Sequence, residues 1–454
     1  MAETTAGPAA PHSLKRVIGR RTLLLFVVGD ILGAGIYALV GKVAGHAGGA
    51  LWLPFLVAFV LAALTATAYA ELVGKYPKAA GAALYANRAF GIPFVTFLVA
   101  FAVMMSGVTS ASAAARAFGG SYLGEFVTLP TVVGAFGFLA LVTLVNLAGI
   151  SESVRVNVVL TVIEAFGLLV IVAIGVYALL TGEGEPARAL EFHPEHGAFM
   201  GVLGGTALAF YALLGFEDSV NLAEEAKDPP RDFPRALFGG LAAATVIYMA
   251  VAFTATMLVE TETLVASTGP LLEVVRVAGL AFPPKLFALI ALLAVGNTAL
   301  INMIMASRLV YGMAREGIVP GAFAVVHPRR ATPWVAILFT VAVAAVLVAT
   351  GDVAGLADTT VLLLLCVFTM VNVAVLVLRR DPVAHDHFRA PSWMPALGAV
   401  VCLVLALPVT GRGADVYARA GLLLGVGALL WLVNRLFMGG GGGLRPGSER
   451  RSSS

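Results

Sequence analysis

Twelve apolar runs, each close to the length of a membrane-spanning helix, follow one another along the chain. A helix needs about 20 apolar residues to cross roughly 30 Å of hydrocarbon. The sequence is 59% hydrophobic and 12% charged, whereas about 25% of the residues of an average soluble protein are charged. These features predict an all-α polytopic membrane protein. The runs lie at residues 22–45, 51–73, 91–119, 131–149, 156–181, 199–222, 235–259, 284–308, 333–350, 356–378, 393–411 and 416–437.

Lysine and arginine residues are distributed unevenly among the segments between these runs. Most of the 29 basic residues fall in the two terminal segments and in the loops on their side of the membrane. Cytoplasmic loops carry the excess of Lys and Arg in membrane proteins. We therefore expect a multi-pass protein of the cytoplasmic membrane with both termini in the cytoplasm. Residues 1–20 have the composition of a disordered cytoplasmic arm, and residues 438–454 that of a flexible tail.

A glycine-rich interruption divides the first apolar run. Gly29, Asp30, Gly33 and Gly35 stand inside Phe26–Gly45. Glycine is a poor helix former, and unwound backbone at membrane depth persists only where protein or a water-filled cavity meets its polar groups. The interruption therefore predicts a broken span whose backbone binds a polar ligand. The alternatives are a close-packed glycine face between helices and an Asp30 that only hydrogen-bonds nearby backbone.

The sixth run carries a second interruption. Gly215 stands within it, and Glu217 and Asp218 follow before the apolar pattern ends. The first run of each half of the chain is thus interrupted by glycine and carries an acid. Corresponding broken helices in two halves are typical of inverted-repeat transporters whose binding site lies near the middle of the membrane. The second interruption favours this interpretation over a packing face.

Four motifs extend the pattern to a known family. They read GDILGAGIYALVG at 29–41, AELVGKYPKAAGAALYANRAFG at 70–91, GFEDSVNLAEEAKDPPRDFPRAL at 215–237 and ASRLVYGMAREGIVP at 306–320. In this order they resemble the amino acid–polyamine–organocation (APC) superfamily of secondary transporters. The resemblance implies a transporter domain at 21–437 with the leucine-transporter fold. It would comprise inverted five-helix repeats at about 21–182 and 198–379 and two extra helices at about 392–437.

The resemblance also implies a substrate site at the two interruptions. Backbone N–H groups at the first would hold a carboxylate, and free carbonyls at both would hold an ammonium group. The electrostatics agree, because the start of a half-helix carries partial positive charge and its end partial negative charge. Tyr211 either caps this cavity or packs among apolar neighbours. The implied substrate-binding residues are Ile31, Gly33, Ala34, Gly35, Ile36, Tyr211, Leu214, Gly215 and Asn302.

Three residues are candidates for coupling transport to a cation gradient: Glu217, Glu164 and Thr298. A charge at membrane depth is costly and marks a functional site by default. Glu217 either takes up a proton or is a permanently paired carboxylate, and Asp218, on another face, is the weaker candidate. Proton-coupled relatives carry a lysine in the region of Glu164, so this acid either titrates or belongs to a static polar network. Thr298 matches the wall of the relatives' cation site.

The backbone groups at the two interruptions match one carboxylate and one ammonium group, and no unambiguous acid is left for a second, distal cation. We therefore expect a neutral amino acid slightly ahead of a cationic one as the substrate. Proton-coupled uptake is the expected mode, and amino acid–polyamine exchange is the alternative. An enzyme, a channel and a transporter-like sensor are less compatible with the sequence. We find no nucleophile–base pair at membrane depth, no continuous polar stripe and no output domain.

No cofactor, metal or nucleic-acid partner is expected; the partners are a small amino acid, protons and the lipid bilayer. The paired histidines His193 with His196 and His385 with His387 fit solvated loops better than a metal site. Either Met104 or Met105 shapes the wall of the site, or both only fill space in the core.

Overall fold

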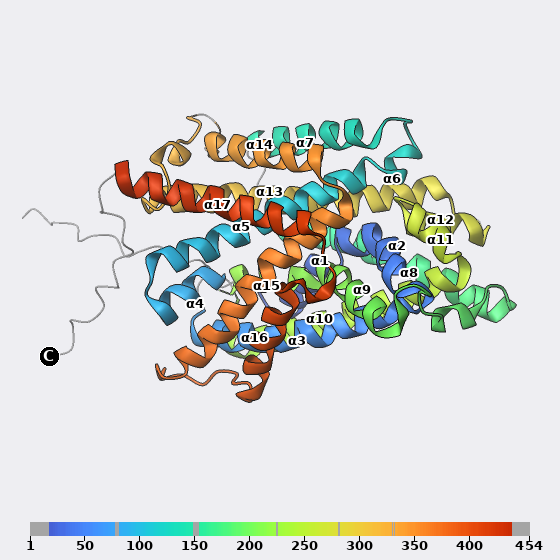
Figure 1. Ribbon diagram of the computed structural model, residues 1–454, viewed down its shortest axis with the longest axis horizontal. Coiled ribbons are helices and arrows are strands. Elements are labelled where there is room, and N and C mark those ends of the chain that lie inside the picture. The colour runs from blue at the N-terminus through green and yellow to red at the C-terminus, as the bar shows by residue number, and fades with distance from the viewer. Residues whose placement is uncertain are drawn as a thin grey trace, which may run out of the picture.

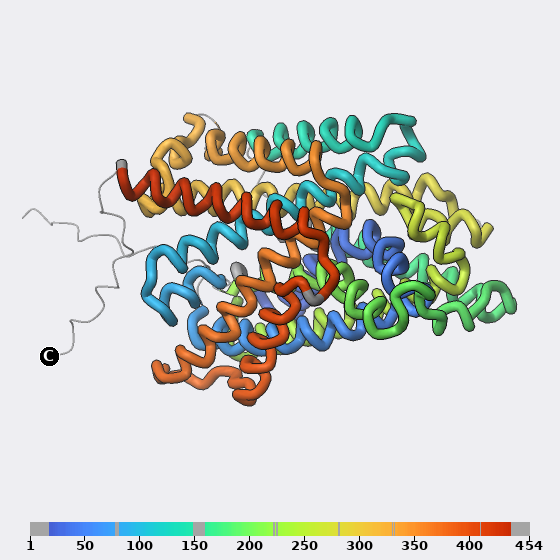
Figure 2. Tube along the Cα trace, viewed as in Figure 1, coloured from blue at the N-terminus to red at the C-terminus, as the bar shows by residue number. Residues whose placement is uncertain are grey.

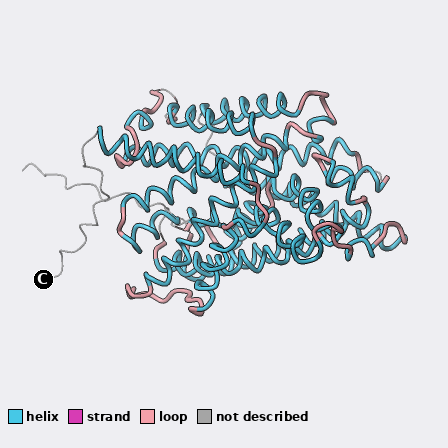
Figure 3. Tube along the Cα trace, viewed as in Figure 1, coloured by secondary structure: helices cyan, strands magenta, loops and turns pink. Residues whose placement is uncertain are grey.

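The computed structural model describes residues 18–77, 81–148, 154–223, 226–279, 282–328, 330 and 332–437, and its regular elements are all helical (Figure 3). Almost all of the predicted arm and the whole tail lie outside these residues. The elements are α1 (Arg20–Ile31), α2 (Ala34–Ala47), η1 (Gly48–Ala50), α3 (Trp52–Lys75), α4 (Gly81–Phe90), α5 (Pro93–Phe118), α6 (Ser121–Gly124), α7 (Thr131–Ala148), α8 (Val154–Thr181), η2 (Pro186–Leu190), α9 (Gly197–Leu213), η3 (Leu214–Leu222), α10 (Pro229–Leu258), α11 (Thr261–Ala266), α12 (Pro270–Ala278), α13 (Pro284–Arg315), η4 (Gly321–Ala324), α14 (Trp334–Thr350), α15 (Val353–Leu378), α16 (Trp393–Ala406), η5 (Pro408–Thr410) and α17 (Ala414–Phe437).

Nine helices of the described part are long and apolar enough to cross a membrane, and the bent pair α1–α2 makes a tenth. Large apolar side chains such as Leu144, Leu180 and Leu422 are exposed on α7, α8 and α17, as lipid contact requires. The chain is therefore a polytopic helical membrane protein. Helices α14 and α16 have 17 and 14 residues, or about 26 Å and 21 Å of rise, so the predicted total of twelve spans stays a prediction.

The long helices run roughly side by side in two groups (Figures 1 and 2). In the first group, α3 packs on α10 and α9, α2 on α9, and α1 on α10. In the second, α5 packs on α13, α15 and α14, and α7 on α14. Figure 1 shows α4 at one end of the bundle and the short helices α6, α11 and α12 at the other. The two groups enclose the candidate site.

Two of the long helices are interrupted at the positions where the sequence carries glycine and acid. Helix α1 ends at Ile31 and α2 begins at Ala34, with a bend of 41° between them. Helix α9 ends at Leu213, and the chain continues as the 3₁₀ helix η3. A mid-helix stretch of 3₁₀ structure often marks a functional hinge or local strain. Both interruptions face the space between the two groups of helices.

Candidate functional site

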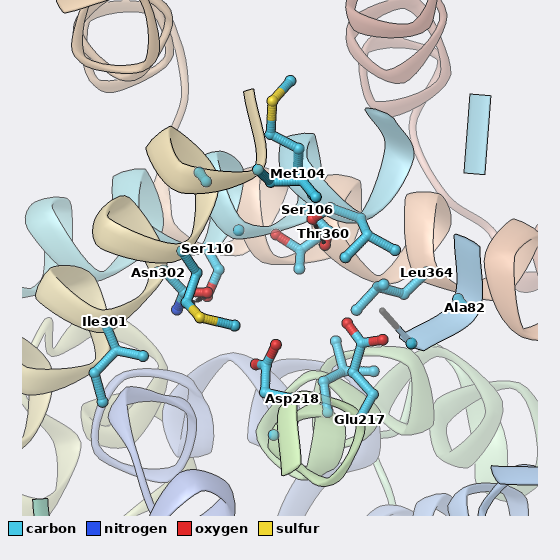
Figure 4. Close-up of a pocket in the computed structure, with 18 of the residues that line it drawn as sticks. Ala82, Met104, Ser106, Ser110, Glu217, Asp218, Ile301, Asn302, Thr360 and Leu364 are labelled. Carbon is cyan, nitrogen blue, oxygen red and sulfur yellow. Dashed lines mark hydrogen bonds between the residues drawn. The ribbon is translucent and has the colours of Figure 1, made fainter. Parts of the chain in front are cut away.

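A cavity of about 580 Å³ lies between the two interruptions and the facing helices α5, α13 and α15 (Figure 4). Ten of the twelve predicted site residues line it, and Ile36 and Glu164 do not. Three separate stretches of the sequence therefore contribute to one cavity. The ten are Ile31, Gly33, Ala34, Gly35, Tyr211, Leu214, Gly215, Glu217, Thr298 and Asn302.

The two interruptions touch each other through Gly215. A Cβ atom built on this glycine would stand 2.1 Å from the carbonyl oxygen of Asp30 and 2.9 Å from the nitrogen of Ile31. Any side chain at this position would overlap the backbone of α1. Glycine is therefore required here for the close approach of the two broken helices.

Helix α2 starts at the cavity with N–H groups that have no acceptor in the preceding turn. The N–H of Ala34 donates to the Thr298 hydroxyl at 3.0 Å. Gly35 lines the cavity and also packs on α9, because a Cβ there would lie 2.5 Å from the Cα of Ala212. Gly35 therefore both borders the cavity and packs closely against a neighbouring helix, so the two interpretations of the glycine-rich segment do not exclude each other. Ile36 is fully buried behind this turn.

One hydroxyl, that of Tyr248 on α10, joins both interruptions. It donates to the carbonyl of Ile31 and also lies 3.3 Å from the carbonyl oxygen of Ala212, where α9 ends. Tyr248 is fully buried and stacks edge-on against Phe55. Sequence reasoning missed this residue, since a tyrosine in an apolar run carries no local signal of its partners.

Helix η3 presents both of its acids to the cavity. A 3₁₀ helix has three residues per turn, so residues three apart are aligned. The aligned pairs Leu214 with Glu217 and Gly215 with Asp218 line the cavity, whereas Phe216 and Ser219 face the core. Figure 4 shows the two carboxylates diverging, that of Glu217 toward Leu364 and that of Asp218 toward the side of Asn302. Asp218 occupies a different face from Glu217, as predicted, but that face also borders the cavity.

The acids differ in their partners. Glu217 is 8% exposed, and the hydroxyl of Tyr69 lies 3.4 Å from one of its carboxylate oxygens. Asp218 is partly exposed to the cavity, and its carboxyl has no hydrogen-bond or ion-pair partner within the residues that the structure describes. Asp30 also lines this deep part of the cavity.

A short chain of hydrogen bonds crosses the cavity between α9, α5 and α13. The hydroxyls of Tyr211 and Ser110 lie 2.9 Å apart, and the amide of Asn302 donates to the Ser110 hydroxyl at 3.4 Å. The same amide donates to the carbonyl of Thr298 at 3.0 Å. Tyr211 is thus a polar wall residue that links the two groups of helices. Ser110 was not identified from the sequence, where it is one of several small polar residues of its span.

Glu164 is 1% exposed and lies behind the cavity wall. Its carboxylate accepts from the Asn297 amide at 3.3 Å, and its backbone carbonyl accepts from the Tyr37 hydroxyl at 2.8 Å. Asn297 directly precedes Thr298 on α13, and Thr298 accepts the hydrogen bond from the first N–H of α2. Glu164 therefore contacts the residue next to the one that holds the start of α2. One turn before Glu164 on α8, the hydroxyl of Thr161 occupies the space that a Cβ on Gly29 would need.

The cavity reaches one end of the bundle and is covered at the other. Gly81, Arg308, Glu316 and Ile318 line its outermost part, at the end where α4 lies. Toward the opposite end, the buried hydroxyl of Tyr122 donates to the carbonyl of Tyr37 at 2.7 Å. The rings of Phe118 and Phe138 stack 4.0 Å apart on that side. The cavity therefore extends toward the end of the bundle that holds α4.

The remaining candidates are the paired histidines, which lie apart from the helix interruptions, and the two adjacent methionines of α5. The Nδ1 atoms of His193 and His196 are 3.1 Å apart, and His385 contacts the carbonyl of Gly74 at 3.0 Å. Among the described residues, no group of three or more His, Cys, Asp or Glu is arranged to hold a metal ion. Met104 lines the cavity, whereas its neighbour Met105 is buried and does not.

Interrupted spans and a cavity at their interruptions define the class: a multi-pass helical membrane protein with an internal cavity. The family model described as amino acid permease matches residues 18–419. The chain therefore belongs to the amino acid permease family, whose members are transporters rather than enzymes. This confirms the resemblance to the APC superfamily.

Individual relatives match over most of the chain. The branched-chain amino acid permease BcaP of Bacillus subtilis is 27% identical over 425 residues, covering 88% of this chain and 90% of the relative. An uncharacterized transporter of Mycobacterium tuberculosis is 30% identical, with 94% and 93% covered. The vacuolar cationic amino acid transporter 4 of Arabidopsis thaliana is 31% identical, with 82% of this chain and 64% of the relative covered.

Proposed function

We propose that this protein is a secondary active transporter that moves amino acids across the cytoplasmic membrane by alternating access. The observation that carries the proposal is the cavity at two touching helix interruptions. N–H groups are available at the start of α2, and carbonyl groups are available where α1 and α9 end. A zwitterionic amino acid matches this arrangement without any side-chain charge. The names of the relatives, which include amino acid permeases and transporters, support the same substrate class.

In this proposal the substrate carboxylate binds the first turn of α2. The N–H group of Gly35 would bind it, together with that of Ala34 once the Thr298 hydroxyl moves aside. The ammonium group binds carbonyls at the ends of α1 and α9, including that of Ile31. That carbonyl oxygen has a second lone pair beside the one used by Tyr248. Asn302 and Tyr211 form the wall next to the substrate.

The described conformation corresponds to the inward-facing state if both termini are cytoplasmic, as the distribution of basic residues predicts. The cavity then opens toward the cytoplasm beside α4, and contacts between α2 and α6 and between α5 and α7 cover its outer side. The full architecture would comprise twelve spans in two inverted five-helix repeats and two extra helices. In it α14 and α16 are short or tilted spans, for which local thinning of the bilayer compensates.

Proton coupling is the proposed mode, with Glu217 and Glu164 as the groups that take up the proton. Glu217 borders the cavity next to the second interruption, and Glu164 lies beside the α13 segment that contacts the first. Loss of a negative charge at either place changes the balance between conformations. Exchange of amino acids against polyamines is the second candidate, and the carboxylates of Glu217 and Asp218 in the cavity favour it.

Reconstitution into proteoliposomes tests these proposals. The full chain should take up at least one labelled α-amino acid, and an inward proton gradient should accelerate the uptake. Uptake that needs preloaded substrate but no gradient would indicate an exchanger instead. Uptake of putrescine with no response to any α-amino acid would overturn the assignment of the carboxylate site.

A further inference from the structure

We infer that the cavity selects amino acids with a second positive charge, and that Asp218 is the residue that pairs with it. The inference rests on the proposed transport function and names the substrate class of the same site. It departs from the preference for neutral amino acids that the sequence suggests, because the sequence does not show that Asp218 faces the cavity.

The charge balance of the cavity is the first argument. Glu217 and Asp218 line it next to the second interruption, and the one lysine or arginine among the described lining residues is Arg308. Arg308 is exposed and belongs to the open end. A neutral amino acid brings one carboxylate and one ammonium group, which the helix interruptions match, and so leaves the excess of carboxylates unchanged. Uncompensated charge is costly where water is scarce, so a distal ammonium group lowers the free energy of the complex.

The partners of the two η3 acids distinguish them. The carboxylate of Glu217 contacts the Tyr69 hydroxyl and is almost fully buried, whereas Asp218 is partly exposed to the cavity. Asp218 has no protein partner in the described part of the chain. A ligand cation can therefore reach Asp218 without displacing an existing contact. Pairing with a charged donor is the strong form of hydrogen bond for a carboxylate.

Distance is the third argument. Asp218 stands one 3₁₀ turn beyond Gly215, which corresponds to about 6 Å along the helix axis. Gly215 marks the place where the substrate's α-amino and carboxylate groups would bind. A lysine side chain spans about 6 Å from Cα to its nitrogen when extended. The lengths match, and a shorter basic side chain such as that of ornithine falls only slightly short.

The walls suit the stem of such a side chain. Met104, Ile301 and Leu364 line the cavity between the breaks and its open end and offer apolar surface (Figure 4). Methylene groups of lysine pack on apolar surface while the ammonium group keeps polar contacts. The combination of an apolar wall and one unpaired carboxylate fits a basic amino acid better than a diamine, because a diamine leaves the N–H groups of α2 without a carboxylate.

Lysine and norleucine form a matched pair for the test, since they share a four-carbon side chain and differ in the ammonium group. We expect the wild type in proteoliposomes to transport lysine with kcat/KM at least about tenfold above that for norleucine. Asp218→Asn should lower kcat/KM for lysine by about 10- to 100-fold, the range for losing a hydrogen bond to a charged group. In the same variant, kcat/KM for norleucine should change less than about threefold. Asp218→Glu should restore part of the preference for lysine.

Two further variants separate a local from a general charge effect. Glu217→Gln removes a neighbouring carboxylate of the cavity and should lower the lysine-to-norleucine ratio far less than Asp218→Asn does. Glu260→Gln removes an exposed acid at the far end of α10 and should leave transport unchanged. Cadaverine, which is lysine without its carboxylate, should inhibit lysine uptake only weakly.

The outcomes are distinguishable. Wild-type preference for norleucine over lysine overturns the inference, whether or not the variants fold. An unchanged ratio in Asp218→Asn, or an equal loss of both substrates in folded Asp218→Asn, does so too. Strong transport of cadaverine without lysine would point to an amine carrier. If the wild type moves no α-amino acid at all, the proposed function itself fails.

Discussion

The two helix interruptions occupy corresponding places in the two halves of the chain but are built differently. Between α1 and α2, the helix stops for two residues, bends by 41° and resumes as α-helix. Between α9 and η3 there is no gap, and the chain tightens into 3₁₀ geometry. The first interruption brings Asp30 and the backbone at the start of α2 to the cavity, and the second brings Glu217 and Asp218. Similar glycine signals in the sequence thus produce a gap between two α-helices in one half and a continuous 3₁₀ helix in the other.

Substitution at the contact between the two interruptions should have the largest effect on transport and stability. Gly215→Ala would place a Cβ 2.1 Å from the Asp30 carbonyl oxygen, so the two broken helices must separate. We expect uptake to fall more than about tenfold and the melting temperature in detergent to drop, since overpacking costs about 1–3 kcal/mol. Gly425→Ala on α17 is the control, because a Cβ there meets nothing within 4 Å. Equal behaviour of the two variants would mean that the interruptions are not in contact.

Substitution of Gly35 tests the first interruption less specifically. Gly35→Leu and Gly35→Val should abolish uptake, as expected for a residue beside free N–H groups. The same loss would follow from the overlap with Ala212 on α9. Substrate binding measured in detergent on the folded variants separates the two causes. Unchanged uptake in either variant would remove this segment from the site.

The acids should dominate the response to a proton gradient. Glu217→Gln and Glu164→Gln keep the shape of the side chain and mimic its protonated form. If either residue carries the proton, its variant should still exchange substrate but lose acceleration by an inward proton gradient. Counterflow and gradient-driven uptake, measured on the same proteoliposomes, give both quantities. Full gradient dependence in both variants would exclude these carboxylates, and its absence in the wild type would indicate an exchanger or a uniporter.

Tyr248 should have a moderate effect, because it connects both interruptions through one hydroxyl. Tyr248→Phe keeps the ring against Phe55 and removes the hydrogen bonds. We expect KM to rise about fivefold to tenfold with little change in kcat, since a buried hydrogen bond contributes about 1 kcal/mol. Tyr85→Phe is a matched control, as Tyr85 is equally buried and its hydroxyl has no partner among the described residues. An identical response of both variants would reduce Tyr248 to a packing residue.

Thr298 should show the smallest effect. Thr298→Val retains the shape and removes the hydroxyl that accepts from the N–H of Ala34. We expect KM to change about threefold, because one neutral hydrogen bond is lost and the substrate carboxylate takes the same N–H. Thr340→Val is the control, since that hydroxyl only bonds within α14. A loss of all transport in Thr298→Val would instead assign this residue to coupling.

Much of the fold follows from local patterns in the sequence. Ten of the apolar runs coincide with helices, or a bent pair, of spanning length, because a bilayer tolerates only segments that satisfy their own backbone. The interruption near Gly33 was predictable, because glycine destabilises a helix wherever it stands. The family resemblance implied a cavity lined by Ile31, Gly33, Ala34 and Gly35, and these four residues do line one, whereas Ile36 does not. Tyr248, Ser110 and Asn297 were not predictable, since their roles depend on partners far away in the chain.

The sequence by itself determined that this chain is a helical membrane protein with two interrupted spans, since hydropathy and glycine content act locally. The family motifs carried the same information. Only the tertiary structure decided what the interruptions face. Whether Asp218 borders a cavity depends on the 3₁₀ geometry of η3 and on α5, α13 and α15 opposite it. Whether Glu164 does so depends on how α8 packs behind α1 and α13. Such relations join residues more than a hundred positions apart, and no local pattern of the sequence encodes them.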